Sequence, residues 1–537
     1  MFTECKKCGD GLQCKDDYAT LKSGYWWKWR NETHKRRYKE FIKNLLKPVP
    51  ALGQDDVQYP YPIPIQYKCR MERSCKGGLD SECENGYEGP LCDVCSLNHY
   101  KQFQACKRCP SRNWIVGQLS VIAVILVLIL VVSVYVSRKS RKNDKERSPI
   151  DVLLAKLKVA VGFYQVTYGL LEAFSYIQWP DSIQVIGTYS EILQLNILQM
   201  APVRCLFPGL RVDAFRNLFA IMSINCVIII ASGTVYGVRK LLILADKNIE
   251  INEKLKRVKQ TKEVVFRNLF FFMYVTYLST CSKTAAVLPL ACQNLCRDDK
   301  EERLCPQYLK ADYSIRCDDS RYKQSVVVAY ISIVYVIALP AATFIALWRQ
   351  RNQIAATKAT ETSGKGESTT ELITGLGFLY ESYKPSSWYW ELIEMSRKVI
   401  VTSGLILVGQ ETRSYIGLTL VIAGLYGTLF CWIHPLQDIF ETRLMSTSLS
   451  VTVVNLVVGA VSRIPAENIP AHNDSYLDSL VFNILVLGAN SAVIALLVGK
   501  MISVTVISQI WLGRRGAGEP LNCVTVAKSP HKENNIL

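Results

Sequence analysis

The side chains of this chain best placed to do chemistry in apolar surroundings are acidic and basic residues of one segment. That segment is 379–401, LYESYKPSSWYWELIEMSRKVIV. Glu391, Glu394 and Lys398 recur at helical spacing, and Arg397 lies beside them. Opposite charges four residues apart, such as Glu394 and Lys398, can neutralise one another on a helix. Two interpretations follow. We favour a salt-bridged turn at the cytoplasmic face of a membrane over a gate or an ion site.

Three further ionisable residues, Glu172, Arg216 and Lys283, fall in otherwise apolar segments. A charged side chain is costly in the centre of a bilayer, so each should face the protein interior or a water-filled cavity. Arg216 and Lys283 are close enough to the ends of their segments for the side chains to reach the interface. We therefore expect Glu172, more than Arg216 or Lys283, to serve a pathway for an ion or a substrate through the membrane.

Catalytic motifs are not found in this sequence. It holds no G-x-S-x-G, no phosphate-binding glycine loop and no H-E-x-x-H, and its five histidines are scattered. We therefore expect no enzyme activity, no cofactor and no metal site. The formal charge of +17 over 537 residues is distributed in basic loops, without a basic groove, so we expect no nucleic-acid partner.

The cysteines are clustered: ten of the 19 precede residue 114, and four more fall within 291–325. Such clusters predict disulfides on the oxidising side of a membrane. A zinc ribbon is the alternative, because Cys92-x2-Cys95 and Cys106-x2-Cys109 have metal-ligand spacing. We favour disulfides, with their pairing left open. The candidates are Cys5, Cys8, Cys14, Cys69, Cys75, Cys83, Cys92, Cys95, Cys106, Cys109, Cys292, Cys296, Cys305 and Cys317.

Two sequons predict glycosylation at Asn31 and Asn473. The first lies in 24–42, GYWWKWRNETHKRRYKEFI, where aromatic residues precede a basic run. This stretch could bind an acidic glycan or anionic headgroups. We favour the interpretation in which the aromatic residues pack a small domain and the basic run is a solvated helix face.

Nine apolar segments of about 20 residues predict a mainly α-helical protein with a polytopic transmembrane bundle. The segments are 114–136, 159–177, 214–238, 266–290, 326–348, 388–408, 415–433, 444–461 and 480–504. The loops after the first and third segments are strongly basic and should stay in the cytoplasm. This predicts a plasma-membrane protein with both sequons and the N-terminus outside and the C-terminus inside.

Composition divides the chain into five parts. They are a cysteine- and aromatic-rich segment (1–47), a Pro-rich linker (48–66), a cysteine-rich module (67–113), the bundle (114–507) and a cytoplasmic tail (508–537). Because a cysteine module begins within five residues of Met1 and no signal peptide precedes it, we expect the C-terminal piece of a longer surface protein.

Between the third and fourth apolar segments, residues spaced three or four apart form a repeat of barely three heptads. Such a repeat could allow two helices to pair. We favour an amphipathic extension within one chain. The repeat consists of Leu241, Leu244, Asn248, Ile251, Leu255 and Val258.

Stretch 83–110, CENGYEGPLCDVCSLNHYKQFQACKRCP, resembles the C-terminal part of EGF-like and laminin-type EGF-like modules, with Gly86 and Gly89 supplying tight turns around Tyr87. With the phrases GYWWKW, KVAVGFYQV, YLKADYSIRC and GFLYESYKPSSWYWELIEMSRKVI, nearly the whole chain resembles the C-terminal part of large surface proteins. Those proteins join EGF-like repeats to a polytopic region similar to transient-receptor-potential-like (TRP-like) domains. The resemblance implies an EGF-like ectodomain on a helical bundle and transfers no catalytic motif.

Two non-enzymatic functions fit these features. A receptor- or adhesion-like surface protein explains the cysteines and sequons, with the lipid bilayer and an extracellular protein or glycan as partners. A TRP-like ion channel or transporter explains why more spans are present than an anchor needs. No TVGYG-like filter and no matching pair of broken-helix halves is found. We expect the receptor-like function; the sequence is compatible with an oligomer.

Overall fold

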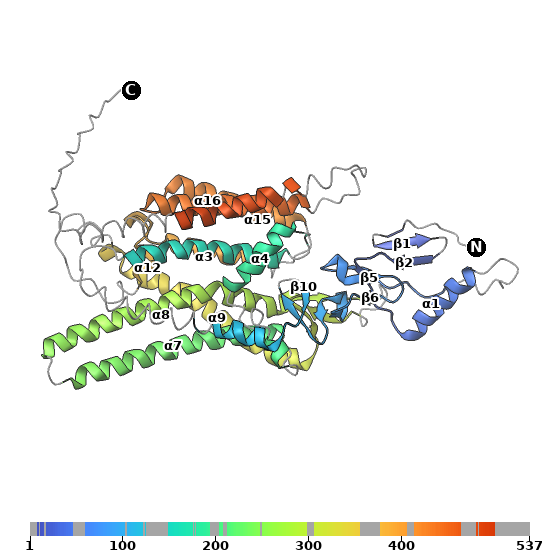
Figure 1. Ribbon diagram of the computed structural model, residues 1–537, viewed down its shortest axis with the longest axis horizontal. Coiled ribbons are helices and arrows are strands. Elements are labelled where there is room, and N and C mark those ends of the chain that lie inside the picture. The colour runs from blue at the N-terminus through green and yellow to red at the C-terminus, as the bar shows by residue number, and fades with distance from the viewer. Residues whose placement is uncertain are drawn as a thin grey trace, which may run out of the picture.

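The computed structural model describes residues 8–9, 11–15, 18–46, 59–102, 105–121, 124, 149–174, 177, 179–193, 203–207, 212–246, 250–297, 305–354, 376–404, 413–462, 480–481 and 483–499. This part is mainly helical, with a bundle of long helices and a disulfide-rich N-terminal domain at one end (Figure 1). Helices α7 (Ala214–Ala245) and α8 (Ile251–Val287) form a hairpin that projects past the opposite end. We call these the domain end and the hairpin end.

The N-terminal domain consists of short antiparallel strand pairs and one amphipathic helix, α1 (Glu32–Leu45). The helix begins where the Asn31 side chain accepts a hydrogen bond from the His34 amide at 2.8 Å, an N-cap. It buries Tyr38, Phe41 and Ile42. The strands are β1 (Leu12–Lys15), β2 (Tyr18–Leu21), β3 (Tyr25–Trp26), β4 (Tyr67–Lys68), β5 (Cys75–Gly77), β6 (Glu82–Cys83), β7 (Tyr87–Glu88), β8 (Val94–Cys95), β9 (His99–Gln102) and β10 (Ala105–Arg108), with short 3-10 helices η2 (Glu72–Ser74) and η3 (Pro90–Cys92).

The two cysteine-rich segments on either side of the Pro-rich linker fold together. Strand β3 pairs with β4, so that Tyr25 lies opposite Lys68 across the linker. The described end of the linker packs on α1, where the rings of Tyr59 and Tyr38 lie 4.9 Å apart. The aromatic residues Trp27 and Trp29 are buried in the same core, which is the packing role favoured from the sequence.

The bundle is built from α3 (Pro149–Ala173), α4 (Asp181–Leu193), the short α6 (Val203–Leu206), α7, α8, α9 (Ser320–Arg349), α12 (Gly377–Tyr380), α13 (Trp390–Val399), the π-helix η8 (Ile400–Gly404), α15 (Arg413–Ile433) and α16 (Ile439–Ser462), with 3-10 turns η5 (Pro289–Ala291) and η7 (Pro385–Ser387). Helix α3 lies in the middle of the bundle, with α15 and α16 on one side of it and α7 to α9 on the other (Figure 1). Most side chains of its second half are buried.

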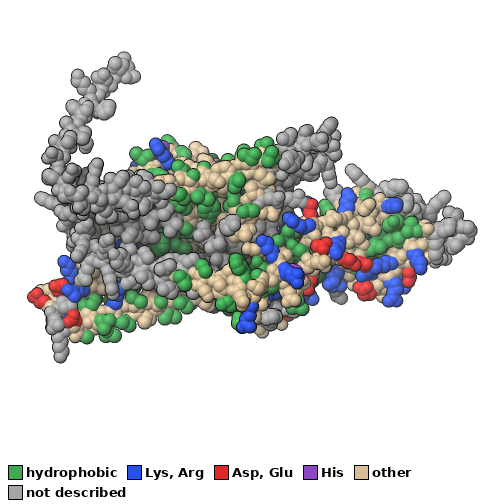
Figure 2. Space-filling view, in the orientation of Figure 1, with side chains coloured by type: hydrophobic (Ala, Val, Ile, Leu, Met, Phe, Trp, Pro, Cys, Tyr) green, Lys and Arg blue, Asp and Glu red, His purple; other side chains and the backbone are tan. Residues whose placement is uncertain are grey.

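Five helices of the described residues are long and apolar enough to cross a membrane. They are Ala214–Ala245, Ile251–Val287, Ser320–Arg349, Tyr415–Ile433 and Ile439–Val461. Each contains or overlaps a predicted segment. On the face shown in Figure 2, charged side chains gather on the N-terminal domain and at the hairpin tip, whereas the described part of the bundle between them shows apolar patches and few charged side chains.

The prediction of nine spans is not supported. Segment 159–177 forms α3, and segment 388–408 contains the ten-residue α13, which carries four charges. Most of the described side chains of both helices are buried in protein, so their composition is not set by contact with lipid alone. Segment 480–504 yields the shorter apolar helix Asn483–Gly499, and most of segment 114–136 lies outside the described residues.

A three-stranded antiparallel sheet covers the domain end of α8 and α9. It comprises β11 (Cys292–Asn294), β12 (Gln307–Leu309) and β13 (Asp312–Arg316). Strand β11 begins five residues after α8 ends, and α9 begins four residues after β13 ends. This sheet therefore connects two of the candidate membrane spans directly to the surface on which the N-terminal domain rests.

Candidate functional site

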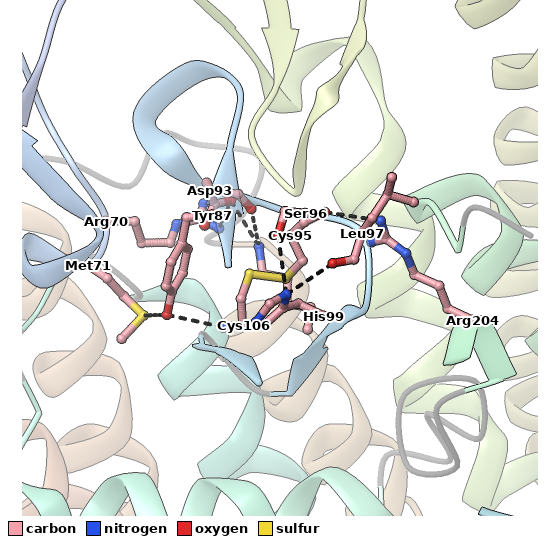
Figure 3. The surroundings of a disulfide bond; sticks show 11 residues. Arg70, Met71, Tyr87, Asp93, Cys95, Ser96, Leu97, His99, Cys106 and Arg204 are labelled. Atoms are coloured by element: carbon pink, nitrogen blue, oxygen red, sulfur yellow. Dashed lines mark hydrogen bonds and ion pairs between the residues drawn. A yellow bond between two sulfur atoms is a disulfide. The ribbon is translucent and has the colours of Figure 1, made fainter. Parts of the chain in front are cut away.

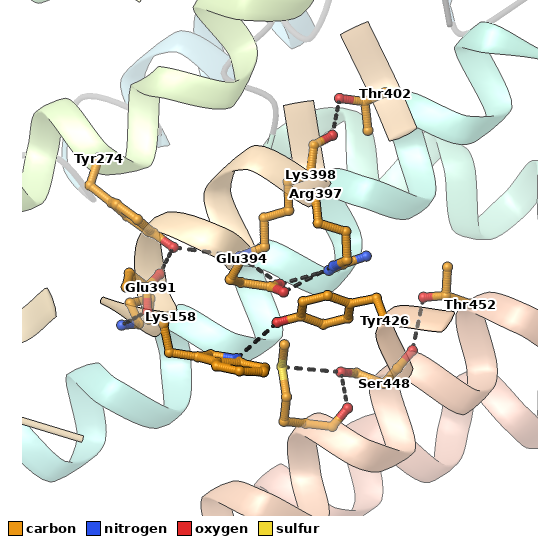
Figure 4. A network of polar contacts seen from close by, with 12 residues as sticks. Lys158, Tyr274, Glu391, Glu394, Arg397, Lys398, Thr402, Tyr426, Ser448 and Thr452 are labelled. Atoms are coloured by element: carbon orange, nitrogen blue, oxygen red, sulfur yellow. Dashed lines mark hydrogen bonds and ion pairs between the residues drawn. The ribbon is translucent and has the colours of Figure 1, made fainter. Parts of the chain in front are cut away.

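A charged network fills the half of the bundle nearer the hairpin. Its charged members are Lys158 of α3 and four residues of α13, Glu391, Glu394, Arg397 and Lys398 (Figure 4). The four residues on α13 are buried in the described structure. Three tyrosines surround them: Tyr274 of α8, Tyr383 before α13 and Tyr426 of α15. The network therefore joins four separate parts of the bundle.

Glu391 is 1% exposed and lies at the centre of this network. Its carboxylate lies 2.7 Å from Lys158 Nζ. The hydroxyl of Tyr383 donates a hydrogen bond to it at 2.7 Å, and the Tyr274 hydroxyl donates another. A buried carboxylate is stable only when its charge and its lone pairs have such partners. The partner of Glu391 is thus a residue of another helix.

Glu394 has its principal partner one turn along α13. Arg397 donates two hydrogen bonds to the carboxylate, from Nη2 at 2.6 Å and from Nε at 2.9 Å, while Lys398 Nζ lies 3.3 Å away. The sequence indicated the pair Glu394–Lys398, and the structure adds the closer Arg397. The guanidinium of Arg397 also stacks over the Tyr426 ring, with 4.8 Å between carbon and centroid.

Two glycines let α3 approach α13 and η8 closely. A Cβ at Gly162 would lie 2.6 Å from Lys398 Nζ, and one at Gly169 would lie 2.5 Å from the methyl carbon of Thr402. Small residues at helix contacts permit such approach in membrane bundles. At the contact η8 has π-helical geometry, and Thr402 donates to the Lys398 carbonyl at 2.7 Å.

A second ion pair lies at the domain end. Lys283 Nζ is 3.4 Å from Glu172 Oε1, which joins α8 to α3. Arg216 is separate from this pair: it lies in the first turn of α7, and its amide donates to the capping Asp213 side chain at 2.9 Å. Within the described structure, Arg216 Nη1 is buried without a hydrogen-bond partner.

Between the two charged sites, α8 carries a row of buried hydroxyls. Asn225 of α7 donates to Thr280 Oγ1 at 3.1 Å, and Thr284 and Ser332 of α9 share a hydrogen bond of 2.6 Å. Ser282 faces Ser403 of η8 at 3.5 Å. Such contacts hold helices together where apolar burial supplies no driving force. The row consists of Thr276, Ser279, Thr280, Ser282 and Thr284.

The described residues contain seven disulfides. They are Cys8–Cys14, Cys69–Cys75, Cys83–Cys92, Cys95–Cys106, Cys109–Cys205, Cys292–Cys317 and Cys296–Cys305. Cys5 and Asn473 lie outside the described residues. Because all four cysteines of the two C-x2-C pairs are in disulfides, they have no thiolate left for zinc. No group of three potential metal ligands is found within the described residues.

The Cys95–Cys106 disulfide is enclosed by polar contacts (Figure 3). The Tyr87 hydroxyl accepts a hydrogen bond from the Cys106 amide at 3.2 Å. Asp93, which is buried, lies 2.9 Å from Lys101 Nζ and 3.4 Å from Arg70 Nη1. The small domain is thus held by covalent and ionic contacts around a limited apolar core.

Cys205 of α6 was not among the cysteines predicted to pair, yet it bonds to Cys109. It lies 96 residues from its partner, and no second cysteine is near it to indicate a cluster. The neighbouring Arg204 donates to the Cys95 carbonyl at 3.0 Å (Figure 3). This pair of contacts attaches the N-terminal domain to the bundle.

The sheet β11–β13 makes the other attachment. Arg70 donates to the Lys310 carbonyl at 2.8 Å, and Tyr67 donates to the Cys296 carbonyl at 3.1 Å. Trp26 shares an apolar cluster with Leu295 and Tyr313. The domain and the bundle are therefore in contact through side chains as well as through one disulfide.

An ionic contact fixes α1 within the N-terminal domain. Asp80 Oδ1 lies 2.8 Å from Lys35 Nζ, and its Oδ2 lies 2.8 Å from Lys39 Nζ. Hydrogen bonds from these ammonium groups lower the pKa of the Asp80 carboxyl. The preceding carbonyl, that of Leu79, accepts from Trp27 Nε1 at 3.1 Å and Trp29 Nε1 at 2.9 Å. The segment around Asp80 thus joins the helix to the aromatic core.

Comparison with known protein families, curated proteins and solved structures finds no match. The structure shows a multi-pass arrangement of candidate spans with a disulfide-rich N-terminal region. The resemblance to EGF-like modules and to TRP-like regions stays a prediction.

Proposed function

We propose that this chain is a multi-pass receptor of the cell surface, in which an extracellular N-terminal domain transmits a binding event to the helical bundle. The observation that carries this proposal is the disulfide between Cys109 and Cys205. A bundle that served only as an anchor would need no fixed contact with the domain that it anchors. Here the domain is attached covalently beside α6 and noncovalently at the sheet β11–β13.

The cysteines support an extracellular position for the N-terminal domain. All seven disulfides lie in that domain or at the domain end, and the free cysteines of the described structure, Cys226, Cys281 and Cys431, lie in bundle helices. Disulfides persist in oxidising compartments. The hairpin, with its many lysines and arginines, then lies in the cytoplasm, as basic loops do.

The ligand of this receptor would be an extracellular protein or glycan that contacts the N-terminal domain. The buried Trp27 and Trp29 do not offer a stacking surface for it. The exposed face of α1 offers basic groups instead, among them Arg36 and Lys43. An acidic ligand, which would contact these basic groups, therefore fits the N-terminal domain better than a ligand that would stack on aromatic rings.

Hydrogen–deuterium exchange of the full chain in lipid nanodiscs tests the coupling. Replacing Cys109 and Cys205 together by serine should raise exchange in β11–β13, in the first turns of α9 and around Glu391. Replacing Cys8 and Cys14 together is the matched control, because this bridge closes a short loop far from the bundle. Changes that stay within the N-terminal domain in both variants would contradict the proposal.

A channel or transporter is the second candidate, and the row of buried hydroxyls on α8 is the observation that favours it. An ion pathway needs ligands that are left free to replace the hydration shell. In the described structure, Glu172, Glu391 and Glu394 are instead paired with basic groups. Current recordings from purified protein in planar bilayers separate the two. Single-channel events altered by Glu172→Gln or Glu391→Gln would replace the receptor by a channel.

A further inference from the structure

Three large apolar side chains are exposed around Cys109–Cys205, the disulfide that joins the N-terminal domain to the bundle. They are Leu97, Trp114 and Phe207, which are 74%, 61% and 62% exposed. Trp114 follows Cys109 by five residues, and Phe207 follows Cys205 by two. We call Leu97, Trp114 and Phe207 the bridge patch. Single exposed apolar residues are common, but three around one link between two parts of a protein indicate a contact surface.

Hydrogen bonds hold the turn that carries Leu97 beside the same bridge. The Cys109 amide donates to the Asn98 carbonyl at 2.9 Å. Arg204 donates to the Cys95 carbonyl at 3.0 Å, and Figure 3 shows its side chain reaching the turn at Leu97. The bridge patch therefore combines a residue of the N-terminal domain with residues of both chain segments that enter the bundle.

On both sides of the bridge, the chain leads from the patch into apolar helices. Residues 112–121 are helical and open the apolar segment 114–136, with Ile115 buried and Trp114 on the exposed side. Phe207 precedes α7, a candidate span, by seven residues. Tryptophan is enriched where membrane helices leave the hydrocarbon for the headgroups. The bridge patch therefore lies at the depth where a membrane surface would meet the domain end.

The sequence around the patch is basic and lacks acidic residues. No aspartate or glutamate occurs in 94–143 or in 192–212. Beside the patch, Lys107, Arg108 and Arg112 are exposed. Lipid phosphates attract such groups and repel carboxylates, so apolar side chains flanked by basic ones are typical of segments that lie in the membrane interface.

We propose that the bridge patch rests in the lipid leaflet at the domain end. Its apolar side chains lie among the headgroups and upper acyl chains, and the three basic side chains contact lipid phosphates. Lipid fits better than a protein partner, because both segments of the patch continue into apolar helices that a bilayer surrounds. The contact requires that the candidate spans cross a bilayer, and it holds whichever ligand the N-terminal domain binds. The domain is then held at a fixed height by the disulfide, the sheet β11–β13 and the membrane itself.

Photocrosslinking of the full chain in phosphatidylcholine nanodiscs tests the contact. Benzoylphenylalanine is incorporated in place of Leu97 or Phe207, and lipid adducts of the irradiated protein are measured by mass spectrometry. Both positions should give lipid adducts, as should Val227 of α7, which is 62% exposed. Leu46 is the matched control and should give almost none, because it is 60% exposed at the end of α1, far from the bundle (Figure 1).

Two results would overturn the lipid contact. Adducts at Val227 without adducts at Leu97 would show that the domain stands clear of the membrane, and equal yields at Leu97 and Leu46 would show that the adducts are unspecific. In cells, a crosslink from Leu97 to another protein would assign the patch to that protein instead. Only protein in which Cys109 remains joined to Cys205 is scored, so that each variant is measured in its folded form.

The contact with phosphates is tested by the three basic residues beside the patch. Replacing all three by glutamine should lower the adduct yield at Leu97 and leave the yield at Val227 unchanged. The matched control replaces three exposed basic residues elsewhere in the N-terminal domain, Lys15, Lys22 and Arg36. This control should leave both yields unchanged. Equal yields at Leu97 in the two triple variants would refute the phosphate contact.

Discussion

Lys158 and Glu391 lie 233 residues apart in the chain, and their Nζ and Oε2 atoms lie 2.7 Å apart inside the bundle. Glu391→Ala should lower the midpoint of thermal unfolding and the amount of protein at the cell surface, because it leaves Lys158 charged and buried. Breaking a buried pair in this way costs about 3–5 kcal/mol. Glu391→Ala with Lys158→Ala should restore part of the loss.

The exposed pair of Arg316 and Asp318 is the control for this experiment, since surface ion pairs contribute only about 0–1 kcal/mol. Asp318→Ala should leave unfolding nearly unchanged. If Glu391→Ala is equally harmless, the pair does not stabilise the bundle.

Gly169→Ala should destabilise the bundle, since the added Cβ would lie 2.5 Å from the Thr402 methyl carbon. Overfilling a packed contact costs about 1–3 kcal/mol. Thermal unfolding of purified protein in detergent measures the effect. Gly424→Ala, where a Cβ meets no atom within 4 Å, is the matched control and should unfold at or above the temperature of the unaltered protein.

Mass spectrometry of nonreduced peptides should find Cys109 joined to Cys205, and Cys95 joined to Cys106. Losing a bridge that closes a loop of this length typically costs about 2–5 kcal/mol. Cys205→Ser should therefore make the N-terminal domain easier to cleave by protease at its junction with the bundle. Free thiols at these four positions, or zinc released by a chelator, would restore the zinc alternative.

The stability of the N-terminal domain should depend on Asp80 in a pH-dependent way. Because Lys35 and Lys39 lower the pKa of this carboxyl, its contribution is present above the ordinary carboxyl pKa of about 4 and is lost as the pH falls through the lower folded-state value. The difference in unfolding temperature between unaltered protein and Asp80→Asn should be present at neutral pH and disappear in acid. The exposed Glu88→Gln serves as control; a difference that persists in acid would contradict the ion-pair account.

Asn31 and Asn473 are predicted to carry glycans, and Asn31 has a second role as the N-cap of α1. Asn31→Gln and Thr33→Ala both destroy the sequon at Asn31, so both should reduce the glycosidase-sensitive shift in mobility by the same amount, that of one glycan. Only Asn31→Gln removes the cap, which is worth about 1 kcal/mol. It should unfold at a lower temperature than Thr33→Ala. A shift of undiminished size in Thr33→Ala would show that Asn31 carries no glycan.

The sequence predicted well those features that depend on local pattern. The long apolar runs around Ile230 and Val334 form helices long and apolar enough to cross a membrane, and the cysteine clusters form disulfides. It overestimated the number of spans, because apolar length alone cannot separate a helix in lipid from one buried in protein. Helix α3 is the example: Lys158 and Glu172 are accommodated by partners on other helices.

The features that the sequence did not reveal depend on contacts between distant residues. Helical spacing within 379–401 indicated the pair Glu394–Lys398, but it could not indicate the partner of Glu391, because Lys158 comes from another helix. Cys205 carried no local signal, because its bond to Cys109 exists only when α6 lies under the N-terminal domain. The glycines at 162 and 169 likewise become meaningful only when α13 and η8 are placed against them.

Helix α8 runs without a break through 37 residues, about 55 Å, from the hairpin tip to a point five residues before Cys292. It carries Tyr274 in the charged network and Lys283 in the second ion pair. Under the proposed receptor function, α8 would have one end on each side of the membrane and would connect the extracellular domain to the cytoplasmic hairpin tip. Thermodynamic linkage is reciprocal, so in such a receptor any factor by which an extracellular ligand changes the affinity for a cytoplasmic partner is also the factor by which that partner changes the affinity for the ligand.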